Sequence, residues 1–126
     1  MSAEIPRSQP LLDDDTRNRL PPLYSGEKLG LNALALVKFF TPDSGFTWYA
    51  SEGSAVDENG YFDTDHDKVD YVFFGLVAGF EVELGYWALS ELEEVRGPLG
   101  LPIECDLYFE PTSLGELKLL HKRGRL

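Results

Sequence analysis

The strongest constraint on the fold lies between Tyr71 and Glu110, in the stretch YVFFGLVAGFEVELGYWALSELEEVRGPLGLPIECDLYFE. Its first part, Tyr71 to Ala78, is an almost unbroken apolar run, which is typical of a strand buried on both faces. Gly79 to Gly85 predicts a turn or bulge, and Tyr86 to Leu89 extends the sheet. The stretch therefore predicts most of a sheet and one edge of its core.

The second part of this stretch predicts a short helix and a half-buried strand. Ser90 and Glu93 have the spacing of a capping box, so we expect a helix over Glu91 to Val95. Ile103 to Glu110 alternates between apolar and polar residues, which predicts a strand with one face toward the core. The residues expected to face inward are Ile103, Cys105, Leu107 and Phe109, and those expected to face outward are Glu104, Asp106, Tyr108 and Glu110.

The remaining elements follow from local patterns on either side. Asp13 to Leu20 predicts a short helix with acidic residues at its positive N-terminal end. Ala33 to Thr41 and Phe46 to Ser51 predict a hairpin of two strands. Glu52 to Asp70 is acidic and irregular, so we expect a long exposed loop or hairpin tip. Ser113 with Glu116 forms a second capping box, which predicts a helix over Leu114 to Leu120.

Together these patterns predict an α+β fold in a single domain. We expect about five strands in an antiparallel or mixed sheet, with short helices packed on one side or at the ends. The 126 residues suffice for one hydrophobic core. The expected organisation is a disordered lead-in over 1–12, a domain over 13–121 containing an acidic loop over 52–70, and a basic tail over 122–126.

Cysteine usage and hydropathy predict the compartment. The chain has one cysteine, Cys105, which excludes an internal disulfide and favours a reducing environment. Its place on the inward face of a strand favours a structural thiol over a nucleophile. The N-terminal residues MSAEIPRSQP lack the apolar core of a signal peptide, and the apolar run from Tyr71 to Phe80 is too short to span a membrane. We therefore expect a soluble, cytoplasmic protein.

The chain is strongly acidic, with a net charge of −11 from 22 acidic and 11 basic residues. The segment from Glu52 to Glu116 contains 16 acidic residues and only two basic ones, Lys68 and Arg96, so its net charge is −14. A surface of this charge repels nucleic acid and anionic membranes and attracts basic partners. The alternative is that the charge serves only to keep the protein soluble.

Four blocks of the sequence resemble a known family. They are LPPLYS, VKFFTPDSGFTWYA, FFGLVAGFEVELGYWALSELEEVRGPLGLPIE and DLYFEPTSLGEL, which begin at Leu20, Val37, Phe73 and Asp106. Together they resemble the bacterial family catalogued as domain of unknown function 2958, over most of the chain from Leu20 to Leu117. The resemblance implies a small protein encoded on plasmids, phages or integrative elements. It implies no activity, cofactor or catalytic residue.

One cluster has the composition of a metal site. Asp63, Asp65 and Asp67 alternate along the chain, at a spacing that can wrap carboxylate oxygens around Ca²⁺. The full loop of an EF-hand would need glycine at position 68 and an acid at position 74, where this chain has Lys68 and Phe74. The alternative is a solvated acidic loop that binds no specific ion.

Two rows of carboxylates form the second candidate site. Glu81 and Glu83 are two apart in an extended segment, so both project from one face. Glu104, Asp106 and Glu110 form a similar row on another strand. If the two strands were neighbours, the rows could supply a carboxylate pair for general acid–base catalysis. The polar outer face of any half-exposed sheet produces the same pattern.

The sequence alone leaves three hypotheses for the function. The leading hypothesis is a non-enzymatic acidic protein that binds a protein partner with a basic surface, in one form by mimicking nucleic acid. Its contact residues would be Glu81, Glu83, Glu104, Asp106 and Glu110. The alternatives are a small carboxylate- or metal-dependent enzyme and a structural accessory domain. We expect no cofactor, no direct binding of nucleic acid and no membrane contact, and the oligomeric state is left open.

Overall fold

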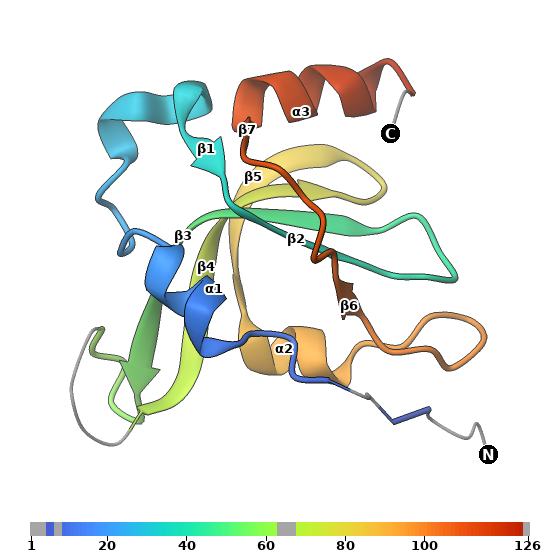
Figure 1. Cartoon of the computed structure of the whole chain (residues 1–126), viewed down its shortest axis with the longest axis horizontal. Helices are drawn as coiled ribbons and strands as arrows, with labels where there is room; N and C mark the ends of the chain where they lie inside the picture. The colour runs from blue at the N-terminus through green and yellow to red at the C-terminus, as the bar shows by residue number, and fades with distance from the viewer. Residues whose placement is uncertain (1–4, 7–8, 63–67, 125–126) are drawn as a thin grey trace.

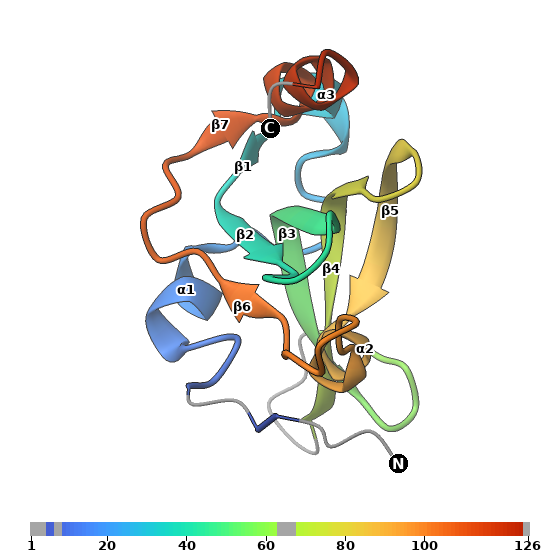
Figure 2. The ribbon, with the colours of Figure 1, turned by 90° about the vertical axis from the view of Figure 1, so that its right-hand side faces the viewer.

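The computed structural model describes residues 5–6, 9–62 and 68–124, shown in two orientations in Figures 1 and 2. In that part of the chain, a five-stranded antiparallel sheet has the strand order β5-β4-β3-β2-β6, and β1 and β7 form a separate two-stranded sheet. The prediction of a single α+β domain is confirmed. The strands are β1 Leu34–Ala35, β2 Val37–Phe40, β3 Thr47–Asp57, β4 Lys68–Ala78, β5 Val82–Ala88, β6 Glu104–Cys105 and β7 Thr112–Ser113. The helices are α1 Asp14–Arg19, the 3-10 helix η1 Glu27–Asn32, α2 Leu89–Glu94 and α3 Leu114–Lys122.

Apolar side chains pack on both faces of the large sheet. On one face, Tyr49 and Leu76 pack against Leu114 and Leu117 of α3, which runs along the top of Figure 1. The other face carries a larger core, which reaches α2 through Leu92 at the opposite end of the molecule (Figure 1). Other members of this core are Leu11, Leu12, Leu20, Val37, Phe39, Phe73, Trp87 and Ile103. Because both faces are covered, β4 is apolar on both, as the sequence predicts.

The prediction of an exposed loop over residues 52–70 is wrong at both ends. β3 continues to Asp57 and β4 begins at Lys68, and the register holds from Thr47↔Ala78 to Asp57↔Lys68 with shifts after Ala50 and Val56. The polar residues of β3 suggested solvent exposure, yet residues 51–55 are buried. Glu52 and Ser54 accept hydrogen bonds from distant backbone N–H groups, and the Ser51 hydroxyl donates to the Phe74 carbonyl, which offsets the cost of burying these polar side chains.

The strand predicted over Ile103 to Glu110 is also wrong beyond Cys105. The Asp106 carboxylate accepts a hydrogen bond from the Tyr108 N–H at 2.9 Å, and the Asp106 carbonyl accepts one from the Phe109 N–H at 3.3 Å. Such local bonds turn the chain and compete with strand pairing. Leu107, predicted to face inward, is consequently 67 % exposed.

Three boundaries also differ from the predictions. β5 already begins at Val82, so the turn before it is shorter than expected. The predicted capping box of Ser90 and Glu93 does not form, because α2 begins at Leu89 and the Ser90 hydroxyl donates to Asp70 at 2.5 Å. The larger core includes Leu11 and Leu12, which lie before the domain boundary expected at residue 13. The Ser113 cap of α3 is confirmed, since its hydroxyl accepts from the Glu116 N–H at 3.2 Å.

The pairing of β3 with β4 requires a glycine at position 75. Gly75 lies opposite Ala50, and a Cβ atom placed on it would clash with the Tyr49 carbonyl oxygen. Replacing it with alanine should lower the free energy of unfolding by about 3 kcal/mol or more, because backbone atoms cannot move aside as a side chain can. The matched control is Gly85→Ala on the paired strand, where a Cβ would meet no atom within 4 Å. Urea denaturation should show a change within about 0.5 kcal/mol for the control, and equal losses in both variants would contradict this account.

Candidate functional site

The two predicted rows of carboxylates lie at opposite edges of the large sheet. Glu83 is on β5, with Glu81 immediately before the strand, whereas Glu104 is on β6. β5 and β6 are the outermost strands, with β4, β3 and β2 between them. Four strand spacings separate them by roughly 19 Å. The two rows therefore do not form the carboxylate pair that was considered for acid–base catalysis.

At the β5 edge, Glu81 and Glu83 act on each other. Both side chains are exposed. A side-chain hydrogen bond with Glu81, together with repulsion from the Glu81 charge, raises the pKa of Glu83. The two carboxylates thus lie close together, as their spacing in the sequence predicts.

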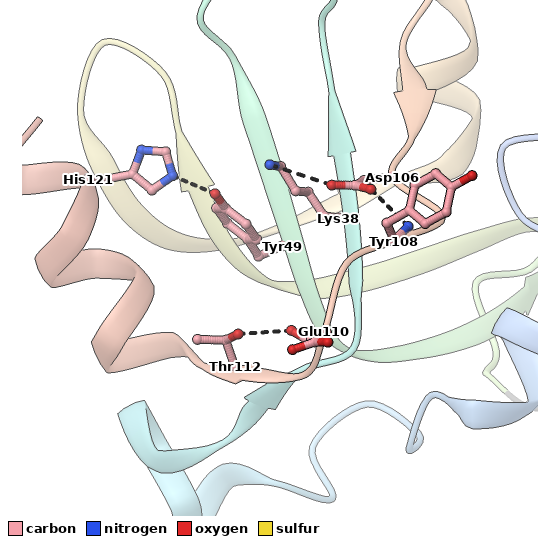
Figure 3. Close-up of polar contacts among 7 residues, drawn as sticks. All are labelled: Lys38, Tyr49, Asp106, Tyr108, Glu110, Thr112 and His121. Atoms are coloured by element: carbon pink, nitrogen blue, oxygen red, sulfur yellow. Dashed lines mark hydrogen bonds and ion pairs between the residues drawn. The ribbon is translucent and has the colours of Figure 1, made fainter. Parts of the chain in front are cut away.

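At the β6 edge, the expected row is broken by the turn at Asp106. Glu104 is exposed, while Asp106 is half-buried and pairs with Lys38 at 3.8 Å. Glu110 is exposed and lies away from Asp106, beside Thr112, whose hydroxyl donates to the Glu110 carbonyl at 2.8 Å (Figure 3). The β6 edge therefore presents two separate exposed carboxylates instead of a continuous row.

The metal site predicted at Asp63, Asp65 and Asp67 lies outside the described residues. Within the ranges 5–6, 9–62 and 68–124, no group of three or more His, Cys, Asp or Glu side chains is placed to hold a metal ion.

A polar cluster beneath α3 joins residues that are far apart in the sequence. The Tyr49 hydroxyl lies 2.6 Å from Nε2 of His121, which α3 brings down onto the sheet (Figure 3). Lys38 Nζ is 5.9 Å from the centroids of both the Tyr49 and the Phe40 rings, and its ion pair with Asp106 completes the cluster. The sequence analysis missed this cluster, because no local pattern relates Tyr49 to a histidine on the last helix.

The electrostatics of this cluster favour a structural role. Burial, and then the Asp106 charge, raises the pKa of Tyr49 to about 12. Burial, and then the Lys38 charge, lowers the pKa of His121. At neutral pH a protonated phenol therefore donates to a neutral imidazole. Both pKa values move away from neutrality, which is the reverse of what acid–base catalysis requires.

Cys105 is equally unsuited to nucleophilic chemistry. Burial, followed by the charges of Asp13 and Asp106, raises the pKa of its thiol to about 11. The thiolate is the reactive form, and at neutral pH it is scarcely populated with such a pKa. This supports the prediction of a structural thiol.

Comparisons with known proteins identify the family. A family model described as "Protein of unknown function (DUF2958)" matches residues 11–117. No curated protein and no solved structure matches the chain significantly. None of the helices in the described residues is long and apolar enough to cross a membrane.

The pair of Tyr49 and His121 should make stability depend on pH. Because the folded state lowers the pKa of His121, the unfolded chain binds a proton more readily near pH 6.5. The contribution of His121 is therefore present above that pH and is lost as the pH falls through the folded-state pKa. When the pH is lowered from about 7.5 to about 5.5, the free energy of unfolding measured by urea denaturation should fall less in His121→Gln than in the wild type. Equal losses in the two proteins would contradict this prediction.

Proposed function

The chain belongs to the DUF2958 family, and we propose that it is a non-enzymatic protein that binds a basic surface of a protein partner through exposed carboxylates. The observation that carries this proposal is the lack of compensating charge. In the part of the chain that the structure describes, Lys38 and Asp106 form an ion pair. Glu81, Glu83, Glu104 and Glu110 are exposed and make no ion pair in that part of the chain. Exposed charges of one sign attract and orient an oppositely charged partner.

The β5 edge supports the proposal most strongly. Glu81 and Glu83 repel each other, so a cation placed between them would relieve this repulsion. Phe80 beside them is 97 % exposed and packs edge-on against Phe46, with ring centroids 5.2 Å apart. An exposed aromatic ring next to charged groups is typical of the anchors in protein interfaces. The tip of the β4–β5 hairpin thus combines an apolar anchor with two carboxylates.

A specific form of this proposal is mimicry of nucleic acid. Carboxylates at the sheet edges would then occupy the positions of phosphates on a nucleic-acid-binding protein. Binding of this kind weakens steeply with salt, because the attraction is screened. It would also compete with nucleic acid for the partner's basic surface.

Retention of proteins from a native bacterial lysate tests this proposal. The immobilised wild-type protein should retain a basic protein at low salt and release it at about 0.5 M salt. Duplex DNA should displace that protein if the carboxylates act as phosphate mimics.

Matched double variants then locate the contact. Glu81→Gln with Glu83→Gln removes the charges of the β5 edge, and Glu104→Gln with Glu110→Gln removes those of the β6 edge. Asp106 is kept because it pairs with Lys38. The control, Asp15→Asn with Glu58→Gln, removes the same charge from exposed positions elsewhere. At least one edge variant should reduce retention about tenfold or more, while the control retains the partner. Unchanged retention in both edge variants would overturn the proposal.

A further inference from the structure

A second acidic feature lies on the face of the large sheet that packs against η1. Glu52, Phe74 and Tyr86 are direct neighbours across β3, β4 and β5, because Glu52 pairs with Phe74 and Phe74 with Tyr86. The residue shift after Ala50 in β3 brings Glu52 into this register. A carboxylate and two aromatic rings therefore form one row on the sheet.

A cavity of about 210 Å³ lies between this row and η1. Glu27 on η1 faces the row across it, and Leu84 adds an apolar wall. The cavity is smaller than the pockets that enclose drug-sized ligands, and it suits a group the size of one side chain.

Glu52 contributes a buried negative charge to this cavity. Glu52 is 5 % exposed, and its two carboxylate oxygens accept hydrogen bonds from the Tyr24 N–H at 2.8 Å and the Gly26 N–H at 2.7 Å. Each carboxylate oxygen can accept a further bond. In the described part of the chain, neither lysine nor arginine pairs with Glu52. The two backbone N–H groups carry no net charge and leave the carboxylate without a counter-ion, so a cation that reached it would be attracted to it.

Further aromatic rings lie next to Tyr86, which lines the cavity. Tyr24 adopts a left-handed backbone conformation with φ of 71°, held by its bond to Glu52. Its ring centroid lies 6.1 Å from that of Tyr86 and 6.3 Å from that of Phe62. Burial, and then the charges of Tyr24, Glu52 and Glu27, raise the pKa of Tyr86. The cavity thus offers ring faces and two negative charges together.

We propose that this cavity binds a guanidinium group. A planar guanidinium stacks on aromatic rings, donates to carboxylates in its own plane and loses its hydration more readily than an ammonium group. Glu52 would accept its N–H groups from within the cavity, Tyr86 would stack on it and Glu27 would add charge from η1. Either a free guanidinium compound or an arginine side chain of a protein would supply this chemistry. The inference stands apart from the proposed function, because a small ligand tests it without any protein partner.

Two small ligands test the proposal on the full chain. n-Butylguanidine carries a guanidinium without a peptide backbone, and N-acetyl-arginine-N-methylamide, which has the same single charge, represents an arginine within a protein. Titration of at least one of them should shift the amide resonances of Tyr24 and Gly26 saturably, with a Kd on the order of 1 mM. Tighter binding of n-butylguanidine would identify a free compound as the ligand, and tighter binding of the capped arginine would identify a protein side chain. N-acetyl-lysine-N-methylamide should bind several-fold more weakly than the capped arginine.

Variants separate the cavity from the overall charge. Tyr86→Leu should weaken binding about fivefold, whereas Tyr86→Phe, which keeps the ring face, should change it less than about twofold. Glu27→Gln should weaken binding, and Glu94→Gln, which removes the same charge from an exposed position on α2, should leave it unchanged. Glu52→Gln should abolish binding, and urea denaturation shows whether that variant still folds. If Glu52→Gln does not fold, Glu27→Gln and Tyr86→Leu still test the proposal, because both positions are exposed and should tolerate substitution.

The proposal is overturned if neither guanidinium ligand shifts the two amides saturably. It is also overturned if the capped lysine binds as tightly as the capped arginine, or if Glu94→Gln and Glu27→Gln have the same effect. The test of the proposed function measures retention of a protein and depends on the sheet edges. Failure of one proposal therefore leaves the other standing.

Discussion

The arrangement of this molecule depends on how Glu52 is buried. Its carboxylate accepts the N–H groups of Tyr24 and Gly26, and Ser54, two residues on, accepts that of Leu23 at 2.9 Å. These bonds fix the segment after α1 against β3, which sets the start of η1 over the sheet. A Cβ on Gly26 would lie 2.6 Å from the Glu52 carboxylate, so the approach needs glycine at that position. Gly26 and Glu27, at the start of η1, line the cavity together with Phe74 and Tyr86.

The carboxylates of the protein lie in three kinds of surroundings: buried, half-buried and exposed to solvent. Glu52 is buried and held by backbone donors, Asp106 is half-buried beside Lys38, and Glu81 and Glu83 face solvent together. The first two kinds of site organise the fold, whereas exposed carboxylates of one sign add little to stability and act at a distance. The proposed function is therefore assigned to the sheet edges, and the proposed guanidinium site to the buried carboxylate.

The sequence predicts those parts of the fold that rest on local patterns. The apolar run of β4, the Ser113 cap of α3 and the closeness of Glu81 to Glu83 all depend on neighbouring residues, and the structure bears them out. The extension of β3 could not be predicted, because the N–H groups that bind the Glu52 carboxylate belong to Tyr24 and Gly26, which precede it by 28 and 26 positions. The same holds for His121, which meets Tyr49 across 72 positions. The end of β6 was missed for the opposite reason: alternation suggested a strand where the Asp106 side chain makes a local turn.

Amide hydrogen exchange at Tyr24 and Gly26 tests the central role of Glu52 most directly. If the buried carboxylate holds both N–H groups, these amides should exchange far more slowly than those of the exposed residues of η1, although they lie in a surface loop. In Glu52→Gln, whose amide nitrogen cannot accept a hydrogen bond, the protection of at least one of them should be lost while β4 remains protected. Rapid exchange of both amides in the wild-type protein would contradict the account.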